Sequence, residues 1–435
     1  MAEMKDSGIH AIGRIPKEWN VVRTKYLANI SIGLVTTMTE NYVEKEEGVP
    51  LIRNGNIRCN KIDVNGIVFL DKRFAEKNKH RQLHTGQIAT VHTGDVGTSI
   101  VIPEEYDGCL GFATIQSTPY KGVSSEFLCW FYNSAAFKNQ CIECSTGDGR
   151  QNLNLYDFVD LFVAIPKYDL QSKIASFLDK KCAEIDSLHT DIEKQIETLE
   201  EYKKSIITEA VTKGLDPDVE MKDSGIEWIG MIPKNWNISR LKYELETSMK
   251  YGASEAGVEY SDDLPRYIRI TDITNNNRLK TGGKLSLTEK QANGYMLEKD
   301  TVLFARSGGT VGKTFLYKPE YGKAAFAGYL ISAIPDKEKM QAEWLYYFSL
   351  SNAYWDWANQ IFTQATIQNI GADKYSNLPI PIPSIDIQNA IVNYLNKKCA
   401  EIDDIITDKK KQLETLEQYK KSVIYEYVTG KKEVQ

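Results

Sequence analysis

The sequence predicts a mixed α/β protein in which one unit occurs twice and each copy ends in a long helix. The first observation is an internal repeat: MKDSGI at 4–9 returns at 221–226, and KKCAEID at 180–186 returns at 397–403, so the offset is 221 − 4 = 217. The second is a set of short β-branched runs in the middle of each copy, which favour strands. The third is an apolar stripe with 4,3 spacing at the end of each copy, which is typical of a long helix.

The repeat divides the chain into six segments. We expect an N-terminal segment equivalent to the central linker at 1–17, a variable domain at 18–166, a spacer helix at 167–213, a linker at 214–233, a second variable domain at 234–383 and a second spacer helix at 384–435. The flanks are nearly identical while the middles differ, which suggests flanks that meet one shared partner and middles that meet two different targets. The alternative is a purely structural duplication, which should drift more evenly along its length.

Each variable domain is expected to contain a curved sheet. The β-branched runs lie at 67–70, 87–92, 99–102, 301–306 and 314–317. Aromatic helices are expected around 126–137 and 343–357. Trp355 and Trp357 could stack on bases, but aromatic residues at helical spacing more often belong to the core.

The first long helix is expected to begin after Pro166, with Asp169 capping its free N–H groups, and to stop near Gly214. Its apolar stripe and that of the second copy predict the seam of a coiled coil. Two such helices related by a pseudo-two-fold axis would pack antiparallel, and residues 1–17 would lie near the end of the last helix. From Leu178 to Ile206 the helix would span about 43 Å at 1.5 Å per residue. His189 and the lysines of the seam are expected to fix the register of the pair.

Composition bounds the class of protein. The chain has 435 residues, 42% of them hydrophobic, and no apolar stretch of membrane-spanning length, so we expect a soluble cytoplasmic protein of two to four domains. Its seven scattered cysteines indicate reduced thiols. Cys141 and Cys144 form one CxxC, but no second pair of ligands lies at a suitable spacing, so no metal site is expected.

The net charge of −6 argues against indiscriminate nucleic-acid binding, so any contact with DNA must be local. The densest basic stretch lies between Asp71 and His84 and contains Lys72, Arg73, Lys77, Lys79 and Arg81. The alternative interpretation of this stretch is a solvated surface loop.

The sequence shows no catalytic motif. SGGTVGKT at 307–314 is close to a phosphate-binding loop, but Ser307 stands where that pattern requires glycine, and the first copy lacks the lysine. A glycine turn shared by both copies predicts a structural hairpin near a binding face. No dinucleotide or AdoMet loop and no hydrolase motif appears either, which favours a protein that is not an enzyme and has no catalytic residues.

Several segments resemble the specificity subunits of Type I restriction-modification systems. The resemblance is carried by IGxIPxxW at 12–19 and 229–236, by QN[LI] followed by an Ile-Pro turn at 151–166 and 368–383, by the glutamines Gln171 and Gln388 that open the helices, and by KKCAEID and TLExYKKS within them. It covers essentially the whole chain, twice.

The resemblance implies two target recognition domains, each reading one half of a split, asymmetric sequence in double-stranded DNA. The helices would set the gap, at about the one DNA turn familiar from dimeric readers. They would also bind two modification subunits, which use AdoMet to methylate adenine, and restriction subunits would join the complex. No cofactor is expected in this chain, because AdoMet, ATP and Mg belong to the partner subunits, and no membrane is involved.

Candidate base-reading residues are polar side chains in loops of the recognition domains, because sequence is read by hydrogen bonds to base edges. For the first half-site they are Arg53, Asn54, Asn56, His92, Arg150 and Gln151, and for the second they are Arg269, Asp272, Arg306, Lys313, Gln364 and Gln368. Two alternatives remain: a solitary regulatory DNA-binding protein, which would bind its site tightly in isolation, and a scaffold whose variable domains bind proteins. The acidic net charge instead predicts weak DNA binding without the modification subunits.

Overall fold

The computed structural model describes residues 3–36, 38–147, 149–274, 278–363 and 368–434. The chain forms two units, Met1–Ile192 with Lys410–Gln435, and Glu193–Lys409. Each unit therefore holds one of the two variable domains, which take the name recognition domain from the resemblance, together with a part of each long helix, α5 (Tyr168–Lys213) and α10 (Ile385–Val428).

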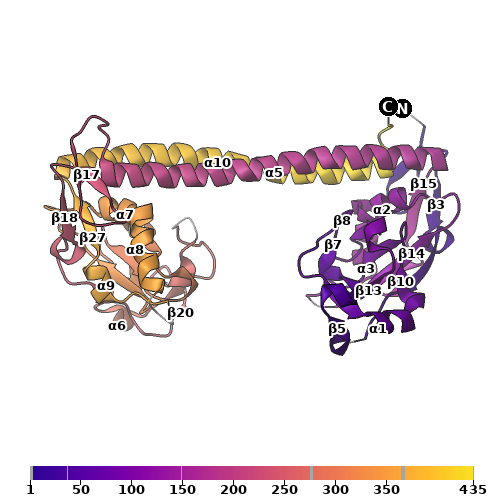
Figure 1. Cartoon of the computed structure of the whole chain (residues 1–435), viewed down its shortest axis with the longest axis horizontal. Coiled ribbons are helices and arrows are strands. Elements are labelled where there is room, and N and C mark those ends of the chain that lie inside the picture. The colour runs from indigo at the N-terminus through magenta and orange to yellow at the C-terminus, as the bar shows by residue number, and fades with distance from the viewer. Residues whose placement is uncertain (1–2, 37, 148, 275–277, 364–367, 435) are drawn as a thin grey trace. The chain divides into compact units, whose positions relative to one another are not determined.

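The first recognition domain contains two main sheets (Figure 1). One has the strand order β10-β13-β6-β9-β5 and the other β12-β11-β14-β4. The strands of the first sheet are β5 (Tyr42–Val43), β6 (Gly48–Arg53), β9 (Val68–Asp71), β10 (Gln82–Leu83) and β13 (Cys109–Phe112). Those of the second are β4 (Ala28–Ile32), β11 (Ile88–Val91), β12 (Ser99–Val101) and β14 (Thr114–Pro119). β6 and β13 run parallel, whereas the pairs of the second sheet are antiparallel.

The second recognition domain repeats this plan. Its sheets have the orders β19-β26-β23-β24 and β20-β22-β21-β25, again with one parallel pair, β21 with β25. The strands are β19 (Lys250–Tyr251), β20 (Val258–Glu259), β21 (Arg266–Ile268), β22 (Leu285–Ser286), β23 (Val302–Ala305), β24 (Thr314–Leu316), β25 (Ala324–Phe326) and β26 (Leu330–Ala333). The predicted mixed α/β class with curved sheets and a repeated unit is confirmed.

Short hairpins and two-stranded sheets join each domain to the long helices. The hairpins are β1 (Met4–Asp6) with β2 (Arg14–Pro16), and β16 (Met221–Asp223) with β17 (Met231–Pro233). The two-stranded sheets are β3 (Asn20–Arg23) with β15 (Phe162–Ile165), and β18 (Asn237–Arg240) with β27 (Pro379–Ile382). In unit 1 the N-terminal hairpin meets the end of α10, where Tyr425 donates a hydrogen bond to the Ile12 carbonyl over 3.1 Å.

The aromatic helices differ from the prediction, because each is split in two. α2 (Ser125–Asn133) is followed by α3 (Ala135–Cys144), and α7 (Ala342–Leu350) by α8 (Asn352–Thr363). The separating residues Ser134 and Ser351 leave the helical conformation, and their hydroxyls donate back to the carbonyls of Phe131 and Phe348, each over 2.6 Å. This local hydrogen bond offers the backbone an alternative to helix continuation.

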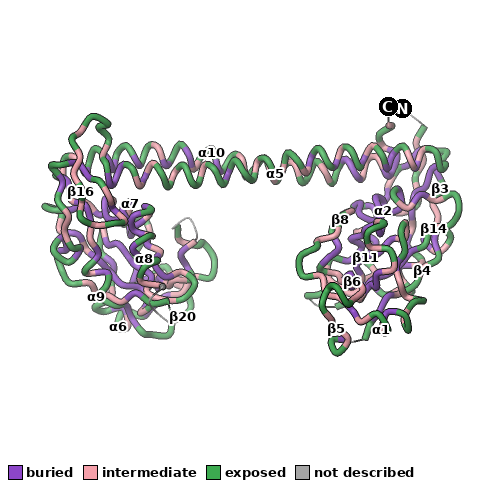
Figure 2. The backbone as a smooth tube through the Cα atoms, in the orientation of Figure 1, coloured by how far each residue is buried: buried purple, intermediate pink, exposed green. Residues whose placement is uncertain are grey.

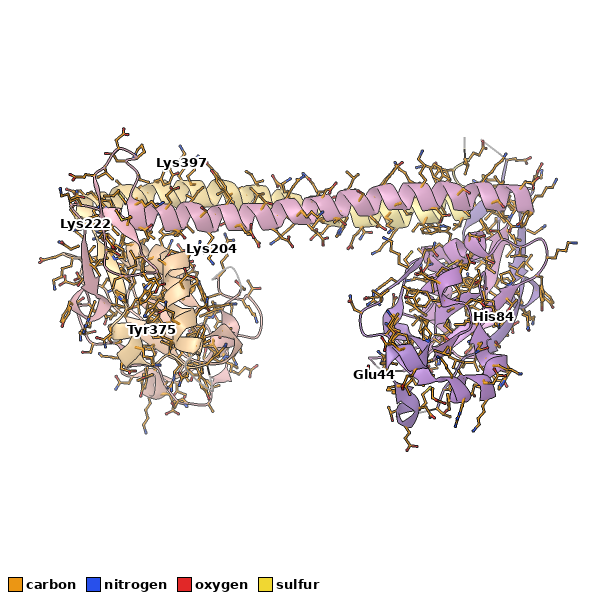
Figure 3. The ribbon with its side chains drawn as sticks, in the orientation of Figure 1. Glu44, His84, Lys204, Lys222, Tyr375 and Lys397 are labelled. Atoms are coloured by element: carbon orange, nitrogen blue, oxygen red, sulfur yellow. The ribbon has the colours of Figure 1, made fainter. Side chains whose placement is uncertain are left out.

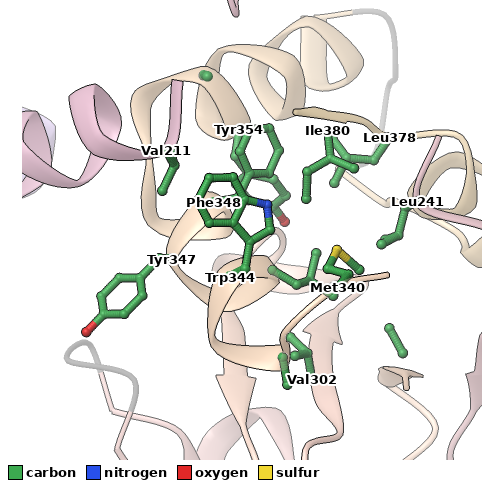
Figure 4. Packing of buried hydrophobic residues seen from close by; sticks show 14 of the residues in the cluster. Val211, Leu241, Val302, Met340, Trp344, Tyr347, Phe348, Tyr354, Leu378 and Ile380 are labelled. Atoms are coloured by element: carbon green, nitrogen blue, oxygen red, sulfur yellow. The ribbon is translucent and has the colours of Figure 1, made fainter. Parts of the chain in front are cut away.

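The aromatic residues of the second domain pack into one core with the end of α5 (Figure 4). Trp344 is fully buried, lies edge-on to Trp236 at 5.6 Å between ring centroids, and donates to the Pro381 carbonyl over 3.0 Å. Trp357 is also buried in this core, which fits the core interpretation of that residue. Figure 2 shows buried residues in the interior of both domains and, alternating with exposed residues, along the long helices.

Within each unit the segments of α5 and α10 run antiparallel. In unit 1 Phe177 packs against Tyr427, and Asp186 pairs with Lys420. Residues later in α5 therefore contact residues earlier in α10. In unit 2 Gln195 bonds with Lys409 and Lys203 with Asp403 in the same sense. The knobs-into-holes packing of a coiled coil remains a prediction.

The start of α5 corrects one expectation. The helix begins at Tyr168, and the carbonyl of Lys167 accepts the first helical hydrogen bonds, from Leu170 and Gln171. Asp169 therefore lies in the first turn and is not the cap. Its charge still suits the N-terminal end of the helix dipole. At the other end Gly214 has a φ of +82°, a conformation that favours glycine, and stops the helix as expected.

The helix-opening glutamines are buried and tie each long helix to its domain. Gln171 accepts from the Ser124 N–H over 2.8 Å and donates to the Pro166 carbonyl over 2.9 Å. Gln388 makes the equivalent pair of bonds with the Gln341 N–H and the Pro383 carbonyl, at 2.8 and 2.9 Å. Among the described residues, no helix combines the length and apolar character that crossing a bilayer requires.

Candidate nucleic-acid interface

In unit 1 a polar cluster forms where the chain leaves strand β11. Thr93 bridges to Asn152, and its hydroxyl donates to the Asn152 Oδ1 over 3.0 Å. The His92 Nδ1 lies 3.1 Å from the same oxygen, and the His92 carbonyl accepts from the Leu153 N–H over 2.8 Å. These bonds hold the His92 ring beside the segment that carries Arg150 and Gln151.

A third segment joins this cluster. Asn54 lies in a single 3-10 turn, η4 (Asn54–Asn56), directly before β7 (Ile57–Arg58), and its Nδ2 donates to the Thr93 carbonyl over 3.1 Å. The structure thus brings Asn54, His92 and Gln151 together from three distant parts of the sequence. Arg150 is exposed, while the Gln151 side chain accepts a hydrogen bond from Ser145.

Two atoms of this cluster lack a partner among the described residues. The Asn54 Oδ1 and the His92 Nε2 are both buried and make no hydrogen bond there. A buried polar atom without a partner costs on the order of 1–3 kcal/mol.

Unit 2 builds the same backbone arrangement with different side chains. Arg306 follows β23 as His92 follows β11, Ser307 bridges to Asn369, and the Arg306 carbonyl accepts from the Ile370 N–H over 2.9 Å. Tyr375, labelled in Figure 3, donates to the Ala305 carbonyl over 2.8 Å and so fixes the end of β23.

Arg306 stacks on an exposed tyrosine. Its guanidinium carbon lies 4.8 Å from the centre of the Tyr251 ring, and its buried Nε has no partner among the described residues. Gln368 is exposed beside Asn369. The Lys313 carbonyl closes the β23–β24 hairpin by accepting from the Ala305 N–H over 2.8 Å, which agrees with a structural role for the glycine turn. Gln364 lies outside the described residues.

Arg53 and Arg269 occupy equivalent capping positions. Each precedes a 3-10 turn. The Arg53 guanidinium donates to the Gly66 carbonyl and that of Arg269 to the Gly283 carbonyl, and these two glycines are repeat equivalents. In unit 2 the Arg269 guanidinium donates to both Asp272 carboxylate oxygens, over 2.8 and 3.0 Å, and these hydrogen bonds raise the pKa of Arg269. Both arginines are therefore held in fixed orientations.

Asn56 and Asp272 are the partners of these arginines and are buried, at 2% and 3% exposure. Asn56 accepts from the Arg53 N–H and donates to the carbonyls of Asp63 and Asn65, and both Asp272 oxygens bond to Arg269. Their polar atoms are thus used inside the domains. We therefore propose no base contact for Asn56 or Asp272.

The basic stretch forms a short helix and a 3-10 turn instead of a loop. Asp71 caps α1 (Lys72–Lys77) by accepting from the N–H groups of Arg73 and Phe74. Arg73 and Lys77 are exposed, whereas Lys79 pairs with Glu76 at 3.0 Å and Arg81 donates to the Gly33 carbonyl over 2.9 Å. Lys72 reaches the Glu46 carbonyl at 3.4 Å. The cations thus project from a folded surface.

Three residues of the clusters were not among the candidates predicted from the sequence. Asn152 and Asn369 stand in the QN[LI] segments, so the signal was present, but their bridging role depends on the distant strands β11 and β23. Nothing in the sequence indicated the role of Tyr251, because this residue lies 306 − 251 = 55 residues before Arg306, the arginine that stacks on it.

The comparisons with known proteins agree with this architecture. The model of the Type I restriction modification DNA specificity domain matches residues 16–198 and again 233–415. The chain is 22% identical over 403 residues to the Type I restriction enzyme StySPI specificity subunit of Salmonella potsdam, covering 90% of this chain and 84% of that protein. It is 24% identical over 429 residues to the MjaVIII specificity subunit of Methanocaldococcus jannaschii, covering 96% and 94%.

A solved structure shares the fold. A chain from work on complex assembly and conformational transition of the type I R-M system superposes with a TM-score of 0.70 at 15% identity, covering 95% of this chain and 98% of that one. The two matches to the model of the DNA specificity domain define a non-catalytic DNA-recognition protein. Because both repeats match the family model, the chain belongs to the family of Type I restriction-modification specificity subunits.

Proposed function

We propose that each recognition domain reads one half of a bipartite, asymmetric sequence in double-stranded DNA. The observation that carries this proposal is the pair of polar clusters, which share one backbone arrangement but present His92 in one unit and Arg306 in the other. A shared scaffold with different reading groups suits two half-sites of different sequence, because each base edge offers its own pattern of donors and acceptors.

The candidates for base contacts are polar side chains in and next to the two clusters. In the first domain the half-buried Asn54 and His92 would meet base edges, and Arg53, Arg150 and Gln151 lie on neighbouring segments. In the second domain Arg306 would read guanine, with Arg269, Lys313, Gln364 and Gln368 as further candidates. Lys72, Arg73, Lys77, Lys79 and Arg81 would position the first domain on phosphates, which carry no sequence information themselves.

The long helices would set the distance between the half-sites and bind two modification subunits. Tyr202 and Tyr419 are repeat equivalents within TLExYKKS and are 57% and 46% exposed on the helices. Exposed tyrosines at matched positions suit a partner present in two copies, since tyrosine is enriched at interface hot spots. The modification subunits would supply AdoMet-dependent adenine methylation, and restriction subunits would bring ATP and Mg to a cytoplasmic complex.

Single-molecule sequencing of methylated DNA tests this function. Cells that carry the chain and its modification subunit are compared with cells that lack only this chain. We expect methyladenine at one split motif, and only when the chain is present. If no motif depends on the chain while the modification subunit is active, the chain is instead a solitary DNA-binding protein or a scaffold.

A further inference from the structure

A second pair of repeat-matched surfaces lies on the recognition domains, formed by residues other than those of the polar clusters. In unit 1 it consists of Arg23, Lys25 and Tyr26, at the end of β3 and in the 3-10 turn η1 (Thr24–Tyr26). In unit 2 it consists of Arg240, Lys242 and Tyr243, at the end of β18 and in η7 (Leu241–Tyr243). We call each group an Arg-Lys-Tyr patch.

The geometry of the two patches is the same. The ammonium of Lys25 lies 5.5 Å from the centre of the Tyr26 ring, and that of Lys242 lies 5.1 Å from the Tyr243 ring. Tyr26 is 67% exposed and Tyr243 is 60% exposed. Each patch therefore presents an aromatic face with a cation beside it, which is a favourable pairing.

One oxygen acceptor orients the cations in each patch. Asp160 receives Arg23 at 3.1 Å and Lys25 at 2.6 Å. Asn377 stands at the equivalent position and receives Arg240 at 3.4 Å and Lys242 at 3.0 Å. The acceptor is thus a carboxylate in unit 1 and an amide in unit 2, whereas the arginine, the lysine and the tyrosine are the same in both.

The residues that the two patch segments share are exposed, whereas a requirement for folding alone would preserve buried residues. Between 20–28 and 237–245 the identical residues are Asn, Arg, Lys and Tyr, and none of them is buried. The buried positions all differ: Thr24 against Leu241, Leu27 against Glu244, and Ala28 against Leu245. Surface substitutions usually change stability by less than about 0.5 kcal/mol, so surface residues are free to drift unless they bind something.

The position of the first patch argues against DNA as its binding partner. Figure 1 shows β3 and β15 at one edge of the first recognition domain and β7 and β8 at the opposite edge, and Asn54 of the polar cluster directly precedes β7. A protein with carboxylates around a pocket for a tyrosine ring fits the patch better.

We infer that the two Arg-Lys-Tyr patches are docking sites for the two modification subunits, one site on each recognition domain. The inference rests on the proposed function, because that function supplies a partner in two identical copies. Identical patches on otherwise divergent domains are what an identical partner requires. Each tyrosine would enter a pocket of the modification subunit, and its flanking cations would meet acidic groups there.

The test measures how many modification subunits bind to the full chain, by native mass spectrometry and by titration. The variants are Tyr26→Ala, Tyr243→Ala and the double substitution, with Lys25→Glu and Lys242→Glu as charge variants. Tyr156→Ala is the matched control, since Tyr156 is 86% exposed in the first domain and its repeat equivalent is Asp373. Thermal unfolding of each chain alone reports on folding.

We expect the wild type and Tyr156→Ala to bind two modification subunits tightly, each single tyrosine variant to bind one of the two more weakly, and the double variant to bind both more weakly, through the helix contacts alone. The loss at an affected site should be roughly 30-fold or more in Kd, as for an interface hot spot. Unfolding temperatures should stay at the wild-type value.

Three results overturn the inference. The variants bind two subunits with wild-type affinity, or they keep this stoichiometry while the complex loses affinity for DNA, or their unfolding temperature falls without a change in binding. In each case a wild type that still directs methylation leaves the proposed function intact. A wild type that binds no modification subunit and directs no methylation overturns both.

Discussion

Lys203 of α5 donates to both carboxylate oxygens of Asp403 of α10, at 2.7 and 2.8 Å. The repeat equivalents of these residues are Lys420 and Asp186, which pair in unit 1 with the roles of the two helices exchanged. Each repeat therefore contributes one cation and one anion to the packing of α5 against α10. Such polar pairs specify the register of packed helices, which apolar contacts alone leave open.

A double-mutant cycle on Lys203 and Asp403 measures the strength of this pair. The side chains are 26% and 38% exposed, so solvent screening limits the coupling energy to about 0.5–1 kcal/mol. We compare Lys203→Ala, Asp403→Ala and the double variant by urea unfolding. The pair Lys181 and Glu184, more exposed at 36% and 49% and contained within one helix, is the control and should give a smaller coupling. Equal coupling energies in both cycles would contradict a role of Lys203 and Asp403 in setting the register of the helices.

The stability contributed by Asp186 depends on pH. Burial by itself would raise the pKa of this carboxyl, but hydrogen bonds from Lys420 and Lys61 outweigh burial and lower its pKa. Because the folded pKa lies below the unfolded value of about 3.9, the stabilisation is present above about pH 4 and is lost as the pH falls through the folded pKa. The difference in unfolding free energy between wild type and Asp186→Asn should therefore be largest at pH 7 and shrink toward pH 3. The exposed residue Asp191 on the same helix provides the control Asp191→Asn. A difference that grows on acidification would contradict this assignment.

Substituting the buried helix-opening glutamine should destabilise the junction between domain and helix. Gln171→Leu removes the partners of the Ser124 N–H and the Pro166 carbonyl, which would cost roughly 2–6 kcal/mol at about 1–3 kcal/mol for each group left unsatisfied. Gln388→Leu should behave alike, because its bonds are equivalent. Chemical denaturation measures both variants against Gln412→Leu, an exposed position on α10. If all three variants unfold at the same denaturant concentration, the buried bonds contribute no net stability.

The two half-sites should respond separately to changes in the polar clusters. His92→Ala should relax or abolish recognition of one half of the methylated motif, and Arg306→Ala the other half, at roughly 1–3 kcal/mol for each lost base contact. Methylation sequencing with each variant reads out the motif directly. A variant that alters both halves equally would indicate a general loss of binding instead of a loss of reading.

Arg73 should contribute affinity without specificity. It is exposed on α1, so Arg73→Ala should weaken the complex for all DNA sequences alike and reduce the slope of log K against log salt by about 1. Fluorescence anisotropy over a salt series measures this slope for the assembled complex. Glu76→Ala on the same helix is the control and should leave the slope unchanged or steeper. A changed motif with an unchanged slope would place Arg73 on a base edge.

The sequence by itself determined the repeat, the mixed α/β class, the two long helices and the family, because these follow from local periodicity and from motifs that recur at a fixed offset. It also indicated most members of the polar clusters, since His92, Gln151 and Arg306 stand next to strand ends or repeated landmarks. Only the tertiary structure decided which loop side chains face outward. Asn54 and Asn56 are two residues apart, yet the first joins the cluster while the second is buried as a capping residue. The direction of each side chain depends on hydrogen bonds to segments far along the chain, and local sequence does not encode those partners.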